Sequence, residues 1–114
     1  MLRILITIFT ILAISGCAAG YPGLRDANTQ GLSSLEIGMP KQQVLSIMGN
    51  KGFGMIDNPA RKEQFAIGND VYEVLYYYTT FIQPGQPMDS GYTPVILKNG
   101  VFTGSGREYL FKIR

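Results

Sequence analysis

One run of β-branched and aromatic side chains constrains the fold of this chain more than any other feature. Residues Val71–Phe81 read VYEVLYYYTTF, the longest such run in the sequence. These side chains favour extended backbone packed in a sheet, and Gly68, Asn69 and Asp70 precede the run as a turn. The sequence therefore predicts a central strand over Val71–Phe81, paired through this turn with a shorter strand over Gln64–Ile67.

A second pair of strands is predicted towards the C-terminus. Thr93–Lys98 and Val101–Gly104 flank the dipeptide Asn99-Gly100. An Asn-Gly pair between such segments predicts a two-residue hairpin turn, because both residues tolerate positive φ. Four cross-strand pairs follow: Leu97 with Phe102 and Val95 with Gly104 on one face, and Ile96 with Thr103 and Lys98 with Val101 on the other. The first face is the more apolar, so we expect it to meet the helices.

Gly104 and Gly106 fall on this predicted helix-facing side of the hairpin. Glycines there would let a helix approach the sheet closely, and they would equally serve chain flexibility near the end of the protein. The sequence leaves both interpretations open.

Two short helices are predicted before the strands. The first ends at Gly38 and can be capped by Asn28 or Thr29. The second has Pro40 in its first turn and Gly49 in the position of a left-handed cap. Their apolar stripes are Leu32, Leu35 and Ile37 in the first helix and Val44, Leu45, Ile47 and Met48 in the second. Each helix therefore buries one face and exposes the other.

The predicted fold class is α+β, with two N-terminal helices packed on one face of a three- to four-stranded antiparallel sheet. In this arrangement Leu75, Tyr77 and Phe81 set the core face of the central strand. The opposite face carries Tyr72, Val74, Tyr76 and Tyr78, and Ile96 and Val101 extend it. Because the strand is apolar on both faces, the reverse register, in which the two sets exchange roles, stays open. The alternating segment Tyr109–Ile113 can also fold over the sheet and cover the tyrosines.

The only long apolar run lies at the N-terminus and is too short to span a membrane. Arg3 precedes Ile4–Ile14, which is interrupted only by two threonines. A spanning helix needs about 20 apolar residues, whereas a positive charge followed by a shorter apolar run and small residues is typical of a cleaved signal peptide. We therefore expect residues 1–16 to be removed.

The residues Ile14–Cys17 (ISGC) resemble the lipobox of diderm bacterial lipoproteins. The resemblance implies cleavage between Gly16 and Cys17 and attachment of diacylglycerol to Cys17. It also implies an outer-membrane location, because Ala18 follows the cysteine where an Asp would mark retention at the inner membrane. The alternative is an ordinary secretory peptide cut near Ala18 or Ala19. Cys17 is the only cysteine, so no disulfide can form within one chain.

Removing the first 16 of the 114 residues leaves 98, which is enough for one small domain. Residues 17–30 are rich in small and turn-forming side chains and predict a lipidated N-terminus with a flexible tether. One α+β domain is expected over residues 31–114.

The composition argues against an enzyme, a metal site and a nucleic-acid interface. The chain has no histidine, its one cysteine would carry lipid, and its ten lysines and arginines stand against eight acidic residues without a basic cluster. Gly104-Ser105-Gly106 is a small-residue turn and not a nucleophile elbow. We therefore expect no catalytic residue, no cofactor, no metal and no nucleic-acid partner.

Three segments, in this order, resemble the BamE/SmpA/OmlA family of outer-membrane lipoproteins. They are Leu35–Gly49 (LEIGMPKQQVLSIMG), Glu73–Tyr78 (EVLYYY) and Thr93–Gly106 (TPVILKNGVFTGSG), of which the last is similar to the closing hairpin of poorly characterised relatives. Pro40 replaces the usual Ser or Thr cap, and Leu75 stands where BamE itself has a tryptophan. The resemblance implies two helices on a three-stranded antiparallel sheet, as in β-lactamase-inhibitor-type domains.

These features predict a periplasm-facing outer-membrane lipoprotein that binds or scaffolds an envelope protein complex, for example in outer-membrane protein assembly or envelope integrity. Aromatic surfaces are enriched at interface hot spots, so Tyr72, Val74, Tyr76 and Tyr78 are the candidate partner-binding residues. The alternative is a periplasmic domain that binds a small ligand, or inhibits an enzyme, through the groove between helices and sheet. A lipoprotein whose loss is nearly silent is a third interpretation.

Overall fold

The computed structural model describes residues 21–49 and 57–114, so the expected signal peptide and the lipid site at Cys17 lie outside the described residues. Its elements are α2 (Tyr21–Ser34), α3 (Lys41–Met48), β1 (Arg61–Ile67), β2 (Asp70–Tyr78), the 3₁₀ helix η2 (Met88–Gly91), β3 (Tyr92–Lys98), β4 (Val101–Ser105) and α4 (Arg107–Ile113). The strands form one antiparallel sheet in the order β1-β2-β3-β4, which confirms the α+β class and the central place of β2. None of the described helices is long and apolar enough to cross a bilayer.

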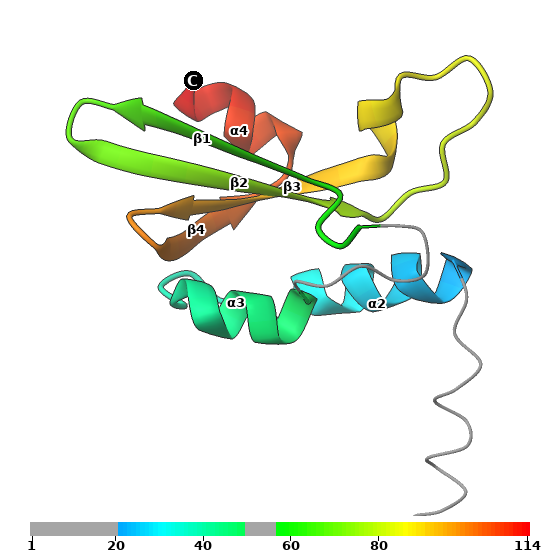
Figure 1. Cartoon of the computed structure of the whole chain (residues 1–114), viewed down its shortest axis with the longest axis horizontal. Coiled ribbons are helices and arrows are strands. Elements are labelled where there is room, and N and C mark those ends of the chain that lie inside the picture. The colour runs from blue at the N-terminus through cyan, green and yellow to red at the C-terminus, as the bar shows by residue number, and fades with distance from the viewer. Residues whose placement is uncertain (1–20, 50–56) are drawn as a thin grey trace, which may run out of the picture.

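Helices cover both faces of this sheet. Figure 1 shows α2 and α3 on one side and the C-terminal helix α4 on the other. The core on the side of α2 and α3 consists of Val44, Met48, Leu75, Tyr77, Val95, Leu97 and Phe102. The two helices before the sheet and the side of the hairpin that meets them are therefore confirmed. The first helix ends at Ser34 and not at Gly38, and Ile37, expected in its apolar stripe, is 79% exposed. The third helix is an addition to the predicted fold.

Helix α3 follows its sequence signals closely. Pro40 stands at its N-cap with extended backbone, and Gly49 stands at its C-cap with a φ of 94°. A positive φ strains residues that carry a Cβ atom, so a glycine ends the helix there at low cost. Val44 and Met48 are buried and place one face of the helix on the sheet.

Helix α2 corrects the expected flexible tether, because the chain is helical from Tyr21 onwards. Its buried stripe contains Leu24, Asn28 and Gly31. Asn28, predicted as a cap, lies in mid-helix and donates hydrogen bonds from Nδ2 to Asn58 Oδ1 (3.0 Å) and to the carbonyl of Tyr78 (2.8 Å). The tether assignment therefore fails for residues 21–30, and α2 belongs to the folded domain.

Both hairpins form, but a β-bulge changes the register of the second. Leu97 pairs with Phe102 as predicted, whereas Ile96 pairs with Gly104, because the register shifts between Ile96 and Leu97 and leaves Thr103 as the extra residue. The predicted pairs of Val95 with Gly104 and Ile96 with Thr103 are wrong. A bulge moves every later side chain to the opposite face, so Gly104 lies on the side of α4.

Candidate partner-binding site

The two faces of β2 are assigned as the sequence predicts, apart from one residue. Leu75 and Tyr77 pack against α2 and α3, and Val74 and Tyr76 belong to the cluster on the opposite face. Phe81, predicted in the core, lies beyond the end of β2 and is 58% exposed. The strand is shorter than the apolar run that predicted it.

The prediction of an open tyrosine face is wrong for the centre of that face, because α4 covers it. Leu110 of α4 packs with Val74, Tyr76 and Ile96, and partly buried Tyr109 and Ile113 join them. Val74 is fully buried and Tyr76 is only 7% exposed. The C-terminal segment does fold over the sheet, but as a helix and not as an alternating strand.

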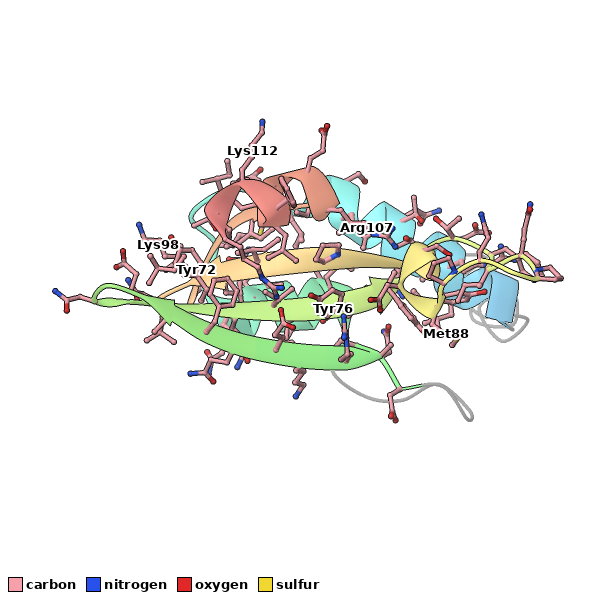
Figure 2. The ribbon with its side chains drawn as sticks, turned by 90° about the horizontal axis from the view of Figure 1, so that it is seen from above. Tyr72, Tyr76, Met88, Lys98, Arg107 and Lys112 are labelled. Atoms are coloured by element: carbon pink, nitrogen blue, oxygen red, sulfur yellow. The ribbon has the colours of Figure 1, made fainter. Side chains whose placement is uncertain are left out.

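The outer two candidates remain half-buried at the ends of the strand. Tyr72 stacks on Phe65 with ring centroids 5.3 Å apart, and Tyr78 meets Tyr92 edge to face at 5.9 Å. Figure 2 shows Tyr72 and Tyr76 on the same side of the sheet as α4. Of the four predicted residues, only Tyr72 and Tyr78 can thus offer part of their surface to a partner.

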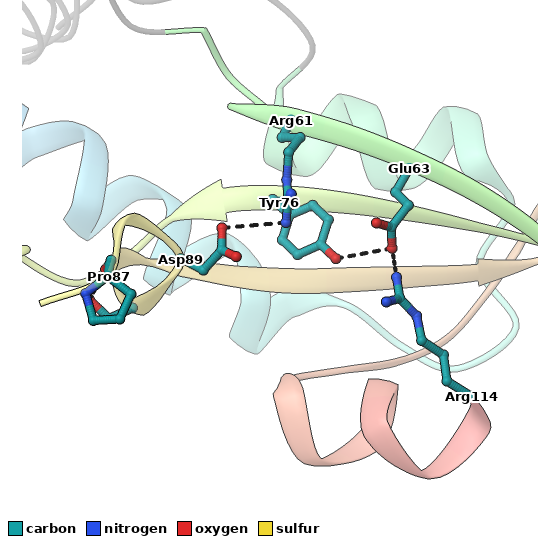
Figure 3. Close-up of polar contacts among 7 residues, drawn as sticks. Arg61, Glu63, Tyr76, Pro87, Asp89 and Arg114 are labelled. Carbon is teal, nitrogen blue, oxygen red and sulfur yellow. Dashed lines mark hydrogen bonds and ion pairs between the residues drawn. The ribbon is translucent and has the colours of Figure 1, made fainter.

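A polar network ties the end of α4 to the edge strand β1 (Figure 3). The Tyr76 hydroxyl donates to Glu63 Oε1 at 3.2 Å, and Arg114 forms an ion pair with the same carboxylate. The guanidinium of Arg61 lies 4.1 Å from the centroid of the Tyr76 ring and 3.4 Å from Asp89. Such partly exposed ion pairs each contribute little to stability, but together they fix where α4 ends.

Two open hollows flank Arg114 and define a surface between β1 and α4. One, of about 440 Å³, is lined by Glu63, Gln64, Phe65, Ile67 and Arg114. The other, of about 560 Å³, is lined by Arg107, Leu110, Phe111 and Arg114. We call Phe65, Ile67, Arg107, Leu110, Phe111 and Arg114 the β1–α4 surface. Its most prominent member is Phe111, which is 85% exposed.

Three arginines lie at or beside this surface. Arg61 and Arg114 have carboxylate partners, whereas within residues 21–49 and 57–114 no ion pair involves Arg107. Arg107 also lines a third hollow with Arg61, Tyr76 and Asp89. An exposed aromatic ring beside an available guanidinium suits a partner that offers both apolar and acidic side chains.

Within the part of the chain that the structure describes, core side chains occupy the space between the helices and the sheet, where the sequence suggested a ligand groove. Tyr77 lies there, fully buried, and its hydroxyl donates to the carbonyl of Gly49 at 2.7 Å. Burial, and secondarily the charge of Glu73, raise the pKa of Tyr77, so the phenol stays neutral. Among the described residues, no three His, Cys, Asp or Glu side chains are grouped so as to hold a metal.

The sequence indicated that Tyr109–Ile113 can cover the sheet, but it did not predict that this segment is helical or that Arg107 and Phe111 lie at the surface. The missed signal is the segment REYLFKI after Gly106, with Glu108 in its first turn and Lys112 in its last. Acidic residues at the start and basic residues at the end favour a helix. At seven residues the helix is too short for apolar periodicity to reveal it.

The sequence model of one protein family, described as "Protein of unknown function (DUF3192)", matches residues 20–111. The match spans both helical layers and all four strands. No curated protein and no solved structure shows a significant match.

Proposed function

The chain belongs to the DUF3192 family, and we propose that it is a lipid-anchored protein of the cell envelope that binds a protein partner without catalysing a reaction. The proposal of a lipid anchor is based on the expected signal peptide and on Cys17, which ends a segment that resembles a lipobox. The resemblance to the BamE/SmpA/OmlA lipoproteins supports the same location, at the periplasmic side of the outer membrane. Outer-membrane protein assembly and envelope integrity are the roles we favour.

The observation that carries the binding role is the exposure of Phe111 on the helix that covers the sheet. Phe111 is 85% exposed, although Leu110 beside it is buried. An aromatic side chain held out by a packed helix and flanked by Arg107 and Arg114 has the composition of an interface hot spot. The binding surface is therefore the β1–α4 surface and not the tyrosine face.

The partner that fits this surface is an acidic segment with apolar side chains. Arg107 supplies a guanidinium that can take a carboxylate in two parallel hydrogen bonds. Phe65, Ile67 and Phe111 supply apolar contact on either side of Arg114. The edge strand β1 lies beside them, so an extended segment can run along it.

Site-specific cross-linking in intact envelopes tests this role. A benzophenone amino acid in place of Phe111 is expected to give a protein adduct whose cross-linked peptide carries acidic residues. The Arg107→Glu change should lower the yield, because it turns attraction into repulsion. The matched control is the same amino acid in place of Ile37, which is 79% exposed on the other layer. Equal yields from the two positions would exclude the β1–α4 surface.

A further inference from the structure

The connection between β2 and β3 begins with a segment that carries no charge and exposes apolar side chains, and it ends in η2, which contains Asp89. Residues 79–88 read TTFIQPGQPM and contain no ionisable group. Phe81 is 58% exposed and Met88 is 67% exposed. The base of the loop is closed, because the amides of Thr79 and Thr80 both donate to the carbonyl of Gly91, at 2.9 and 3.1 Å. The hydrogen bonds at the base of the loop thus help to hold Phe81 and Met88 at the surface.

This loop lies beside the N-terminal end of α2. The guanidinium of Arg25 lies 5.5 Å from the centroid of the Phe81 ring and 5.9 Å from that of Tyr78. Figures 1 and 2 both place the loop at the end of the molecule where α2 begins. Arg25 is one helical turn from Tyr21, so Phe81 belongs to the same end as the first residue of α2.

The sequence leaves little chain between this end and the proposed anchor. Only residues 18–20 separate Cys17 from Tyr21. Four residue steps span at most about 14 Å, whatever conformation they adopt. A lipid on Cys17 would therefore hold the start of α2, and the loop next to it, at the bilayer surface.

We propose that this end of the molecule rests on the lipid bilayer, with Phe81 and Met88 in the boundary between headgroups and acyl chains. The inference rests on the proposed lipid anchor. Residues 79–88 carry no ionisable group, so they can enter that boundary without removing an ion of their own from water, and their apolar side chains gain from leaving water. Asp89, which follows them, is paired with Arg61.

The opposite end of the molecule has the reverse character. The two hairpin turns lie there (Figure 1), and Lys98 pairs with Asp70 at 3.5 Å. Charged turns of this kind stay in water. In this orientation the end of the sheet that carries the β2–β3 loop contacts the membrane. The β1–α4 surface then remains accessible to a protein partner.

Tryptophan fluorescence tests the contact, because the chain has no tryptophan of its own. The lipidated full chain, with Phe81→Trp or Met88→Trp, would be reconstituted into phosphatidylethanolamine and phosphatidylglycerol vesicles, with or without lipids brominated in the acyl chains. The control is Ile37→Trp, since Ile37 follows α2 and lies about 20 Å or more from Tyr21 along the helix direction. Both loop variants keep exposed positions, so folding should be unaffected.

The expected result is a blue-shifted emission for the two loop variants and quenching by brominated lipid at least about twofold stronger than for Ile37→Trp, as an interfacial depth of ~5–10 Å implies. Equal quenching of the loop and control variants on vesicles to which the protein is bound would overturn the inference and leave the anchor intact. Shielding of the loop in envelope membranes but not in pure lipid vesicles would also overturn it, since a protein would then cover the loop. A chain that is unmodified at Cys17 and fails to float with vesicles would overturn the anchor and this inference together.

Discussion

Gly104 lies directly against the ring of Tyr109, so close that a Cβ atom at Gly104 would stand 2.8 Å from Cε2 of that ring. The contact joins β4 to α4 and exists because the bulge at Thr103 turns Gly104 towards the C-terminal helix. It helps to hold α4 over the tyrosine face, and thereby positions Phe111 at the surface.

Replacing Gly104 with alanine is expected to destabilise the protein by about 1–3 kcal/mol, the usual cost of forcing extra volume into a packed contact. Chemical unfolding measures this change. Ser105→Ala, at the exposed neighbouring position, is the control and should stay within about 0.5 kcal/mol of the parent. A Gly104→Ala protein as stable as the control would show that α4 does not pack on β4 in this way.

Substitutions of Tyr76 test whether this residue packs in the core under α4 or lies open to a partner. Because Tyr76 is buried under Leu110, Tyr76→Ala should cost about 3–5 kcal/mol of stability. Tyr76→Phe removes only the hydrogen bond to Glu63 and should cost about 1 kcal/mol or less. Thermal unfolding of the two variants measures this difference. Equal melting temperatures for Tyr76→Ala and Tyr76→Phe would show that Tyr76 is not packed under α4 and that the tyrosine face is open.

Asn28 links α2 to the sheet through buried hydrogen bonds. Asn28→Ala leaves Asn58 Oδ1 and the carbonyl of Tyr78 without their donor, and unsatisfied buried groups of this kind cost about 1–3 kcal/mol each. Among the described residues, the exposed neighbour Thr29 donates its side-chain hydrogen bond only to the carbonyl of Arg25 in its own helix, so Thr29→Ala should have little effect. Hydrogen exchange of the α2 amides gives a second readout. If they exchange at the same rate in Asn28→Ala as in the parent, α2 is not held by this residue.

Asp70 gives a prediction on pH. A hydrogen bond from the Asn99 side chain (2.9 Å) is the largest single cause that holds the pKa of Asp70 below its ordinary value of 3.8, and Lys98 acts in the same direction. Since the pKa is lowered on folding, the stabilisation is complete above about pH 5 and is lost as pH falls through the folded pKa. In Asn99→Gly, which keeps the positive φ of 52° accessible, the pKa of Asp70 should rise towards 3.8.

Titration of the Asp70 carboxyl carbon by NMR measures this shift. Lys98→Gln should also raise the pKa of Asp70, because the charge of Lys98 and its hydrogen bond act in the same direction as the Asn99 amide. An unchanged pKa of Asp70 in Asn99→Gly would show that the Asn99 side chain does not hold it down.

Local signals in the sequence predicted the parts of the fold that depend on neighbouring residues. Asn99 and Gly100 adopt the positive φ that their hairpin turn requires, and Gly49 does so at the end of α3. The alternation of Leu75 and Tyr77 with Val74 and Tyr76 separates the two cores. These features need no knowledge of distant parts of the chain.

The features that the sequence did not reveal depend on tertiary contacts. The buried side of α2 includes Asn28 and Gly31, which break an apolar stripe, and a Cβ atom at Gly31 would stand 2.7 Å from Met48 Sδ. The close approach of α3 therefore explains a glycine that argues against a helix when the sequence is taken alone. The bulge at Thr103 likewise leaves no local signal, so the face of Gly104 was assigned wrongly.

Both proposals depend on lipid at Cys17, and the mass of the mature protein tests it most directly. Intact mass spectrometry of the protein extracted from native envelope membranes should show a chain that begins at Cys17 and carries diacylglycerol on its sulfur. A free thiol at Cys17, or a chain that retains residues 1–16, would contradict the lipid anchor and the function built on it.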